Sequence, residues 1–574
     1  MTTSTSPAMD NLLPQQLSRL LLRLDPALDD STLALVHELV AANQSGHVCL
    51  PLAHRPEYRR LQASPLLGRP GQYAPLILDH AGRLYFARHW FDEQILAQKL
   101  SQLAADRQPP DPLRAGPILD SLFPPGADSQ PDRQKLAAAL AACQRLLVVS
   151  GGPGTGKTTT VVRLLAMLAM LAERPLVMAM AAPTGKAAAR LSESVASARD
   201  SLPVAESVRA QLPRQAQTLH RLLGLRPGAV LPRYHAAAPL PLDVLVVDEA
   251  SMIDLGLMAR LVEALPAQAR LILLGDRDQL ASVDAGAVLG DLCSQVAYLP
   301  ASRAWLAQAG IGQLPADEGV PGALADSVVL LTHSHRFRAD SGIGKLAALV
   351  NGGDGLVALQ LLQRGEHADI VLQAQLDDGA LLQQREPYLA AISQQRPLEE
   401  IQAAFSRFML LAAERQQVAQ ANQRLETLLE QAGSKQAGRD WYAGRPVMIT
   451  ANDYGVGLFN GDIGFTVARA QGLRVAFPAA DGSWREFAPG RIPQHETVFA
   501  MTVHKSQGSE FDEVWLQLPT NPGAVLNRAL IYTAITRARQ RFVVAGSQEV
   551  WLPAVQSAPV RHSGLADLLR QRNA

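Results

Sequence analysis

The chain has 574 residues, of which 48% are hydrophobic and 18% are charged, a composition that excludes a disordered chain and is typical of globular proteins. Its length exceeds what one hydrophobic core usually serves, so several domains are predicted. Lysine plus arginine and aspartate plus glutamate number 53 each, and this balance neither favours nor excludes nucleic acid until charge is located along the chain.

Three features of the sequence bear on location in the cell. Its 3 cysteines lie far apart, without zinc-ligand or disulfide-type spacing. Residues 1–10 have no basic segment followed by an apolar one, so no secretory leader is expected. The most apolar stretch, 161–183, is interrupted by charged residues that a membrane span would not tolerate cheaply. We therefore expect a cytoplasmic protein with no membrane partner.

The first predicted unit covers residues 1–112. Leucines between positions 12 and 22 recur at roughly helical spacing, which predicts a mainly helical domain with an amphipathic core face. The segment 108–117, QPPDPLRAGP, has four prolines and is predicted to break both helix and strand and to act as a linker.

Residues 113–298 alternate short apolar runs with helical patterns. The runs RLLVVS, PLVMAMAAP, DVLVVDE and RLILLGD are typical of buried parallel strands. They predict a first α/β domain with a parallel sheet over 113–298, with a small insertion near 196–240.

A second series of apolar runs begins with SVVLLTHS at Ser327 and continues with ETVFAMTV, EVWLQLP and RFVVAGS. It predicts a second α/β domain of similar kind over 325–441 and 499–574. The intervening residues 442–498 are rich in glycine and alternate apolar residues without a long helical pattern, which predicts a small inserted β-module. The stretch 401–431 has a helical pattern and indicates little beyond packing.

Residues 150–158, SGGPGTGKT, fit the phosphate-loop pattern GxxxxGK[ST] between an apolar strand and a helix. Glycine is needed because backbone N–H groups must wrap closely round phosphate oxygens, and the N-terminus of the next helix favours negative charge. We expect Lys157 to reach the β and γ phosphates of ATP and Thr158 to hold Mg²⁺. A plain glycine turn is the alternative, and the flanking elements argue against it. The predicted nucleotide-binding residues of this segment are Gly151, Gly152, Pro153, Gly154, Thr155, Gly156, Lys157, Thr158 and Thr159.

A carboxylate pair ends the apolar run VLVVDE. We expect Asp248 to reach Mg²⁺ through water and Glu249 to polarise the attacking water, because phosphoryl transfer depends mainly on positioning and charge stabilisation. A solvated strand end is the alternative interpretation of the pair alone. The phosphate loop upstream favours the catalytic interpretation.

Seven segments in order resemble the motifs of superfamily 1 helicases: GGPGTGKT, APTGKAAARL, TLHRLLG, DEAS, LLGDRDQLASVDAG, TVHKSQGSEF and YTAITRAR. The resemblance covers roughly 134–539. The segments GHVCLPL at 46–52 and GRPVMIT with FNGDIG at 444–464 are similar to the RecD family, the alpha subunits of exodeoxyribonuclease V. This resemblance implies two RecA-like P-loop NTPase motor domains, with 442–498 as an SH3-like, β-barrel-like module.

The resemblance also assigns four residues to the ATP site. Gln279 would contact the γ phosphate and report its loss, and Gln134 would read adenine. Arg336 in HSHRF and Arg537 in AITRAR would reach across from the second sheet as arginine fingers, a task that suits a planar, permanently charged guanidinium. Without the resemblance, each would be an ordinary polar loop, helix or surface residue.

Other matching positions would touch single-stranded DNA or couple it to the nucleotide. Thr184 ends a strand and could bond a backbone phosphate, a type of contact that positions a strand without reading its sequence. Taken singly, each position is also compatible with a core or surface role; as a set they predict a track over both sheets. The predicted DNA-binding residues are Thr184, Lys186, His220, Thr502, His504, Lys505, Ser506 and Gln507.

By resemblance the chain is an ATP-dependent, 5′ to 3′ DNA helicase that uses ATP and Mg²⁺. It would act on single-stranded DNA and duplex ends as the alpha subunit of exodeoxyribonuclease V, in double-strand break repair, homologous recombination and DNA degradation. Its partners would be the beta and gamma subunits, with the gamma subunit meeting residues 1–112.

Three alternatives stay open. The chain could be a free-standing RecD-like helicase, or an ATP-gated assembly subunit that does not move on DNA. A nuclease is disfavoured, because none of the seven lysines has Asp or Glu two residues earlier and no clustered His/Asp set lies outside the ATP site. Cutting of DNA is expected in a partner subunit.

Overall fold

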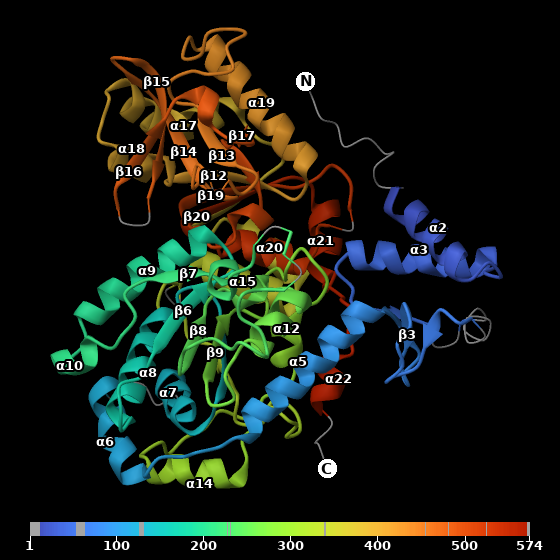
Figure 1. The fold of residues 1–574 in the computed structure, drawn as a ribbon. Helices are drawn as coiled ribbons and strands as arrows, with labels where there is room; N and C mark the ends of the chain where they lie inside the picture. Colours follow the sequence, from blue (N-terminus) through green and yellow to red (C-terminus); the bar gives the residue numbers. More distant parts are fainter. Residues whose placement is uncertain are drawn as a thin grey trace.

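The computed structural model describes residues 12–52, 55, 64–124, 131–226, 228–229, 231–337, 340–453, 455–479, 482–523 and 525–570. Residues 1–11, which include the segment where no secretory leader is expected, lie outside the described residues. The described residues form four sheets. In Figure 1 the two motor domains lie one above the other, with the N-terminal helices at the side. No described helix is both long and apolar enough to span a membrane.

The N-terminal part is mainly helical and also contains a small sheet, in the order β1-β4-β3-β2. Leu21, Leu35, Leu39 and Leu84 form its separate apolar core. The last helix of this part, α5, does not belong to that core. It packs against α12 and α22 and buries its apolar face in the core of the first motor sheet. The elements are α2 (Leu12–Leu24), α3 (Asp30–Gln44), β1 (Leu50–Pro51), β2 (Leu67–Gly68), β3 (Leu76–Leu78), β4 (Arg83–Phe86) and α5 (Ala87–Ala105).

The proline-rich segment 108–117 does not break the helix as predicted. Pro112 takes the first position of α6 (Pro112–Leu122), and the side chain of Asp111 caps that helix. A proline fits there because the first-turn N–H groups have no partner inside the helix anyway. The prediction of a break was therefore wrong for the second half of the segment.

The first motor sheet has six parallel strands in the order β10-β5-β9-β8-β6-β7. Its elements after α6 are α7 (Arg133–Cys143), β5 (Leu146–Gly151), α8 (Lys157–Leu171), β6 (Met178–Ala182), α9 (Gly185–Asp200), α10 (Glu206–Arg209), β7 (Ala216–Thr218), α11 (Leu219–Leu223), β8 (Val244–Val247), η1 (Ala250–Met252), α12 (Leu255–Glu263), β9 (Arg270–Gly275), α13 (Val288–Leu292), α14 (Pro300–Gln308) and β10 (Val328–Leu331).

The assignment of SVVLLTHS to the second sheet was wrong. Its strand, β10, pairs in parallel with β5, with Val328 opposite Val148. An apolar run carries no mark of the sheet it joins, and here the chain crosses to the second domain only after this edge strand. Arg336, which was predicted to belong to the second sheet, therefore follows a strand of the first.

The second motor sheet has five parallel strands in the order β11-β20-β19-β12-β18. The helical pattern predicted for 401–431 concealed β12, because a short apolar run between two helices is compatible with either structure. The elements are α15 (Gly342–Gly352), α16 (Gly355–Arg364), β11 (Ile370–Gln373), α17 (Asp378–Ser393), α18 (Leu398–Phe405), β12 (Phe408–Ala412), α19 (Arg415–Gln431), β18 (Ala500–Thr502), η3 (His504–Ser506), β19 (Phe511–Gln517), α20 (Arg528–Ile535), β20 (Ala538–Ala545) and α21 (Gln548–Gln556).

A fourth sheet lies between α19 and β18 in the chain. Its strand order is β16-β15-β14-β13-β17 and all of its pairs are antiparallel, around a core that includes Val447, Val475 and Phe477. The run ETVFAMTV is thus divided between this sheet and the second motor sheet. The elements are β13 (Pro446–Ile449), β14 (Ile463–Arg469), β15 (Gly472–Pro478), β16 (Trp484–Phe487), η2 (Pro489–Arg491) and β17 (His495–Thr497).

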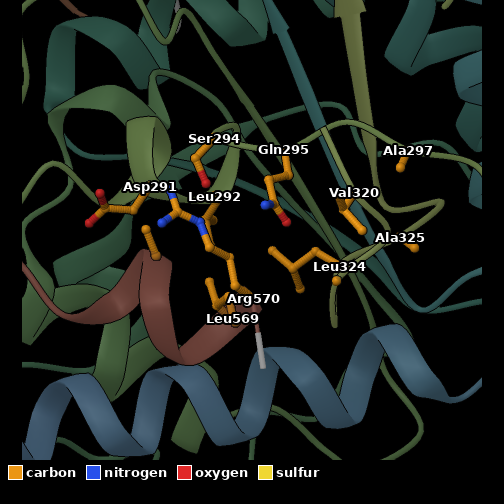
Figure 2. A pocket seen from close by; sticks show the side chains of 12 residues that line it. Asp291, Leu292, Ser294, Gln295, Ala297, Val320, Leu324, Ala325, Leu569 and Arg570 are labelled. Atoms are coloured by element: carbon orange, nitrogen blue, oxygen red, sulfur yellow. The ribbon is translucent and has the colours of Figure 1, made fainter. Parts of the chain in front are cut away.

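The last described residues, 557–570, return from the second motor domain to the N-terminal part, and we call them the C-terminal strap. The carbonyl of His562 accepts from Val48 N (2.8 Å), and the Glu93 carboxylate of α5 accepts from Gly564 N (2.8 Å). The strap ends in α22 (Leu565–Arg570), which lies beside α5 in Figure 1. Figure 2 shows the pocket where Leu569 and Arg570 face Asp291 and Gln295.

Candidate nucleotide site and nucleic-acid interface

The phosphate loop is a cradle with no room for side chains. Gly154 and Gly156 have φ of +78° and +79°, in the left-handed region that favours glycine. A Cβ on Gly154 would overlap Arg336 Cβ, and one on Gly156 would overlap the amide nitrogen of Gln134. The glycines are therefore required for two reasons, backbone conformation and close approach.

The ammonium of Lys157 lies inside this cradle. Its Nζ donates to the carbonyl oxygens of Gly151 (2.5 Å) and Gly152 (3.2 Å), and the Thr155 hydroxyl donates to Gly152 O (2.8 Å). Thr158 and Thr159 follow in the first turn of α8. A compact cation and the free N–H groups of a helix start at one place form a binding site for phosphate.

Asp248 and Glu249 lie at the carboxyl end of β8, where Glu249 has a φ of 53°. The Asp248 carboxylate accepts from Glu249 N (2.9 Å). Burial and the neighbouring Glu249 raise the pKa of Asp248, and Lys157 opposes them. A carboxylate and the Thr158 hydroxyl are oxygen ligands of the kind that Mg²⁺ prefers, so these residues fit that ion.

Gln279 lies in the turn after β9, at the contact between the motor domains. Its side-chain amide donates to Asp276 Oδ2 (2.9 Å), which also accepts from the Tyr532 hydroxyl of α20 (3.1 Å). That hydroxyl lies 2.9 Å from the position a Cβ on Gly152 would take. One carboxylate thus connects the γ-phosphate candidate Gln279 to the second motor domain, beside the phosphate loop.

Gln134 lies in the first turn of α7 and contacts the loop directly. Its Nε2 donates to Thr155 O (3.0 Å) and lies 3.4 Å from His335 Nε2. From the other side, His335 N donates to Gly154 O (2.8 Å) and the Ser334 hydroxyl to Pro153 O (3.1 Å). The segment after β10 is therefore part of the wall of the nucleotide site.

The two candidate arginine fingers meet on one turn of the second motor domain. Arg336 Nη2 pairs with Glu510 Oε1 (2.7 Å), and Arg537 Nη1 donates to Ser509 O (3.2 Å). Arg537 is only 2% exposed, and burial lowers its pKa while Glu249 opposes that effect. The structure thus brings Arg336 and Arg537 together, although Arg336 follows a strand of the first motor sheet and Arg537 precedes a strand of the second.

The DNA-contact candidates of the first motor domain lie at the carboxyl ends of neighbouring strands. β6 and β7 are parallel and place Ala182 opposite Thr218, so Thr184 and His220 leave the sheet at the same edge. Thr184 caps α9, its hydroxyl accepting from Ala187 N (3.2 Å). Burial and the nearby Arg190 lower the pKa of Lys186 to about 8.

The candidates of the second motor domain follow β18. Thr502 ends the strand, Lys505 Nζ pairs with Glu496 Oε1 of the inserted sheet (2.7 Å), and burial and Arg561 lower the pKa of His504. Ser506 and Gln507 point inward instead. Ser506 is fully buried and its hydroxyl donates to Val503 O (2.7 Å), whereas Gln507 Nε2 donates to Leu280 O of the first motor domain (2.8 Å).

Sequence comparisons agree with this architecture. The family model described as AAA domain matches residues 134–285, and the model described as UvrD-like helicase C-terminal domain matches 497–545. The RecBCD enzyme subunit RecD of Mycolicibacterium smegmatis is 41% identical over 89% of this chain and 86% of its own length. The chain belongs to the RecD family. The resemblance found in the motifs is thereby confirmed, and the chain is an ATP-hydrolysing DNA helicase with parallel-sheet α/β motor domains.

Other RecD relatives extend the comparison. The subunit of the same name from Haemophilus influenzae is 37% identical over 88% of this chain and 82% of its own length. The ATP-dependent RecD2 DNA helicase of Deinococcus radiodurans is 30% identical over 95% of this chain and 70% of its own length. Among solved structures, Bacteroides Pif1 bound to ssDNA has 15% identity and a TM-score of 0.42, covering 75% of this chain and 94% of that chain.

Three residues of this RecD-family site were not predicted. Asp276, Glu510 and Tyr532 all lie inside quoted motif segments, GDRDQ, SQGSEF and YTAITRAR. The sequence offered a signal only in the form of a carboxylate or hydroxyl within a helicase motif. Their partners lie far away along the chain, so the bonds they form could not be derived from spacing.

Proposed function

We propose that this RecD-family helicase moves 5′ to 3′ on single-stranded DNA and acts as the alpha subunit of exodeoxyribonuclease V, the RecBCD enzyme. One observation supports the motor cycle above all. The phosphate loop of the first motor domain contacts Arg336 at Gly154, and Arg336 and Arg537 are both bonded to residues 509–510. Only Gly508 separates these two residues from the proposed DNA-contact segment 502–507.

In the proposed site Gln134 and the loop from Gly151 to Thr159 hold ATP, and Thr158 and Asp248 hold Mg²⁺. The ion would supply charge neutralisation at the phosphates. Glu249 orients and polarises the attacking water, and Gln279 contacts the γ phosphate. Lys157 can exchange its two backbone carbonyls for phosphate oxygens, since an ammonium bonds charged acceptors more strongly than neutral ones.

In the proposed DNA track Thr184, Lys186 and His220 contact the strand from the first motor domain, and His504 and Lys505 from the second. Thr502, Ser506 and Gln507 shape the loop that carries the latter pair. Closure of the two domains on ATP and their release after hydrolysis would alternate the grip of the two sides. Such a two-state element, biased by a γ phosphate, is a recurring design of nucleotide-driven switches.

The assembly is proposed from the names of the relatives. Mycolicibacterium smegmatis and Haemophilus influenzae proteins of this family are RecBCD enzyme subunits, so we propose beta and gamma partners, with the gamma subunit on the N-terminal part. We also propose that the inserted antiparallel sheet is an SH3-like barrel. The name of the Deinococcus radiodurans relative supports the alternative of a free-standing helicase, and co-purification of two larger subunits with a tagged chain would decide against it.

The test of direction uses a duplex with one single-stranded tail. We expect the chain, in whatever assembly it purifies, to unwind a 5′-tailed duplex with ATP and Mg²⁺ and to hydrolyse ATP faster when single-stranded DNA is present. Lys157→Gln should lower the ATP hydrolysis that this chain contributes by about a hundred- to a thousandfold, because it removes phosphate charge stabilisation. In the same assembly, any ATP hydrolysis or unwinding that is left in this variant is due to a partner subunit and not to this chain. Unwinding of 3′-tailed duplexes alone by wild type would contradict the proposed direction.

A further inference from the structure

A single turn, residues 508–510, collects arginines from both motor domains, and we call it the arginine turn. From the first motor domain Arg190 of α9 donates to Gly508 O (3.3 Å), and Arg336 pairs with Glu510. From the second, Arg537 donates to Ser509 O (3.2 Å) and Arg539 pairs with Glu510 Oε2 (3.1 Å). The turn therefore contacts both arginine-finger candidates and α9, the helix that Thr184 caps.

Glu510 is the charged centre of this turn. Its side chain is 8% exposed, and its Oε1 accepts from both Arg190 and Arg336. Burial alone would raise its pKa, but Arg190 and Arg336 outweigh burial and lower the pKa to about 2. The carboxylate is thus ionised at every working pH and is shared by guanidiniums that come from opposite sides of the domain contact.

Arg336 has a second donor that is not satisfied. Its Nη2 bonds Glu510, while its Nη1 is buried and has no partner among the described residues. The backbone N and Cβ of Arg336 lie against Gly154 of the phosphate loop. A buried donor without an acceptor is costly, and a phosphate oxygen is an acceptor of the charge that suits it.

We propose that Glu510 is a positioning residue for ATP hydrolysis, which holds Arg336 beside the phosphate loop and links it through Arg190 to the DNA track. This inference rests on the proposed role of Arg336 as an arginine finger. Glu510 lies three residues beyond Gln507. Movement of segment 502–507 when DNA binds therefore displaces the Glu510 carboxylate, and with it the guanidiniums of Arg190 and Arg336. Thr184 caps the same helix that carries Arg190. A DNA contact at Thr184 in the first motor domain can therefore also reach Glu510, through that helix and Arg190.

A purely structural ion pair is the competing explanation, because removing one partner of a buried pair destabilises a protein whatever its role. The chain offers a matched control. Glu513 lies three residues further on, in β19; its side chain is 15% exposed, and it pairs with Arg541 (3.4 Å) and accepts from Trp515 Nε1 (2.6 Å). Glu513→Gln therefore removes a similar carboxylate from the strand that follows the arginine turn, without touching the turn itself.

The experiment measures kcat and KM for ATP, with and without single-stranded DNA, for the full chain in its native assembly. Glu510→Gln should lower the DNA-stimulated kcat by about 10- to 100-fold, less than the loss of an arginine finger itself, and leave KM within about threefold, the pattern of a group that acts in the transition state. Glu513→Gln should stay within about twofold of wild type. Adding Glu510→Gln to Arg336→Gln should lower kcat no further, because residues that act through one another are not additive.

Several results would overturn the inference. If Glu510→Gln lowers kcat by the same factor in the Arg336→Gln background as in wild type, the two residues act independently. A rise in KM without a loss of kcat, or a loss as large in Glu513→Gln, would also overturn it. A strong effect of Arg336→Gln with a normal Glu510→Gln would overturn only this inference, whereas a normal Arg336→Gln would overturn the finger role as well. If Glu510→Gln does not fold, Glu510→Asp keeps the charge, shortens the reach and must show the same dependence on Arg336.

Discussion

Lys186 has a side chain whose charge changes near physiological pH. Burial and Arg190 lower its pKa to about 8, while Asp462 of the inserted sheet opposes them and Arg537 adds to them. A DNA phosphate would favour the charged form, so binding above this pKa must be accompanied by uptake of a proton. The affinity for DNA should therefore be constant below pH 7 and weaken as the pH rises through 8.

This argument gives a prediction for the affinity of single-stranded DNA. At constant salt the dissociation constant of wild type should rise between pH 7 and 9.5, by at most about tenfold per pH unit for one linked proton. Lys186→Arg should remove this rise, because arginine stays charged over the whole range. Fluorescence anisotropy with a labelled oligonucleotide measures both. The same pH dependence in Lys186→Arg and in wild type would exclude Lys186 as the source.

The roles of residues were predictable where the residues that act together are also close in sequence. The phosphate loop of Gly151–Thr158 depends on eight consecutive residues and on glycines that the backbone itself requires. Glu510 and Tyr532 were not predictable, because their bonds cross the molecule: Arg336 and Glu510 are 174 residues apart, and Asp276 and Tyr532 are 256 apart. Long-range pairs of this kind leave no period or spacing in one sequence.

Among the elements, α20 gives the second motor domain a direct contact with the nucleotide site. Its Tyr532 hydroxyl donates to Asp276 in the turn after β9, and its Thr533 hydroxyl accepts from Leu280 N (2.9 Å). The turn that carries Gln279 is therefore bonded to a helix of the other domain. A change in one of these bonds should affect the coupling of the domains more than the fold of either.

Tyr532→Phe tests this contact. Loss of one hydrogen bond to a carboxylate should lower the free energy of unfolding by about 1–2 kcal/mol and kcat for ATP hydrolysis by about three- to tenfold through poorer positioning. Tyr388→Phe is the control, since the buried Tyr388 hydroxyl has no partner among the described residues; this change should be neutral or stabilising. Urea unfolding and steady-state kinetics measure both effects. Equal behaviour of the two variants would contradict a specific role for Tyr532.

Errors at the scale of elements had a common cause. β10 and β12 are short, fully buried apolar runs, and such runs show neither the sheet they join nor, between helices, that they are strands at all. The alternation of strands and helices did predict parallel α/β domains correctly. The limits assigned to those domains stay predictions.

At the scale of the whole molecule, the C-terminal strap connects three parts of the chain. Arg561 donates to the carbonyls of Asp284 (3.1 Å) and Gly286 (2.8 Å) in the first motor domain, and the rings of His562 and His47 stack 4.8 Å apart. Gly286 N in turn donates to Gly46 O (2.9 Å). The strap therefore holds the N-terminal part against the loop that follows Gln279.

Truncation tests the strap. A chain that ends at Ser557 should expose the junction between the N-terminal part and the first motor domain, because Glu93 and His47 lose their strap partners. Limited proteolysis should then cut between residues 44 and 110 markedly faster, and thermal unfolding should begin at a lower temperature. A chain that ends at Arg570 keeps the strap and serves as the control. Equal cleavage of the two chains would show that the strap does not hold the N-terminal part.

The same strap has a consequence for the time course of synthesis. Arg83 bonds Ser563 and Asp567 over separations of 480 and 484 residues. The N-terminal part therefore cannot form its bonds to the strap until nearly the entire chain has been synthesised. Translation proceeds at about 5–20 residues per second, which leaves the face that receives the strap uncovered for roughly half a minute or more. During that interval a ribosome-bound chain carries a vacant docking surface, where a chaperone or an already folded partner protein has time to act before the chain closes on itself.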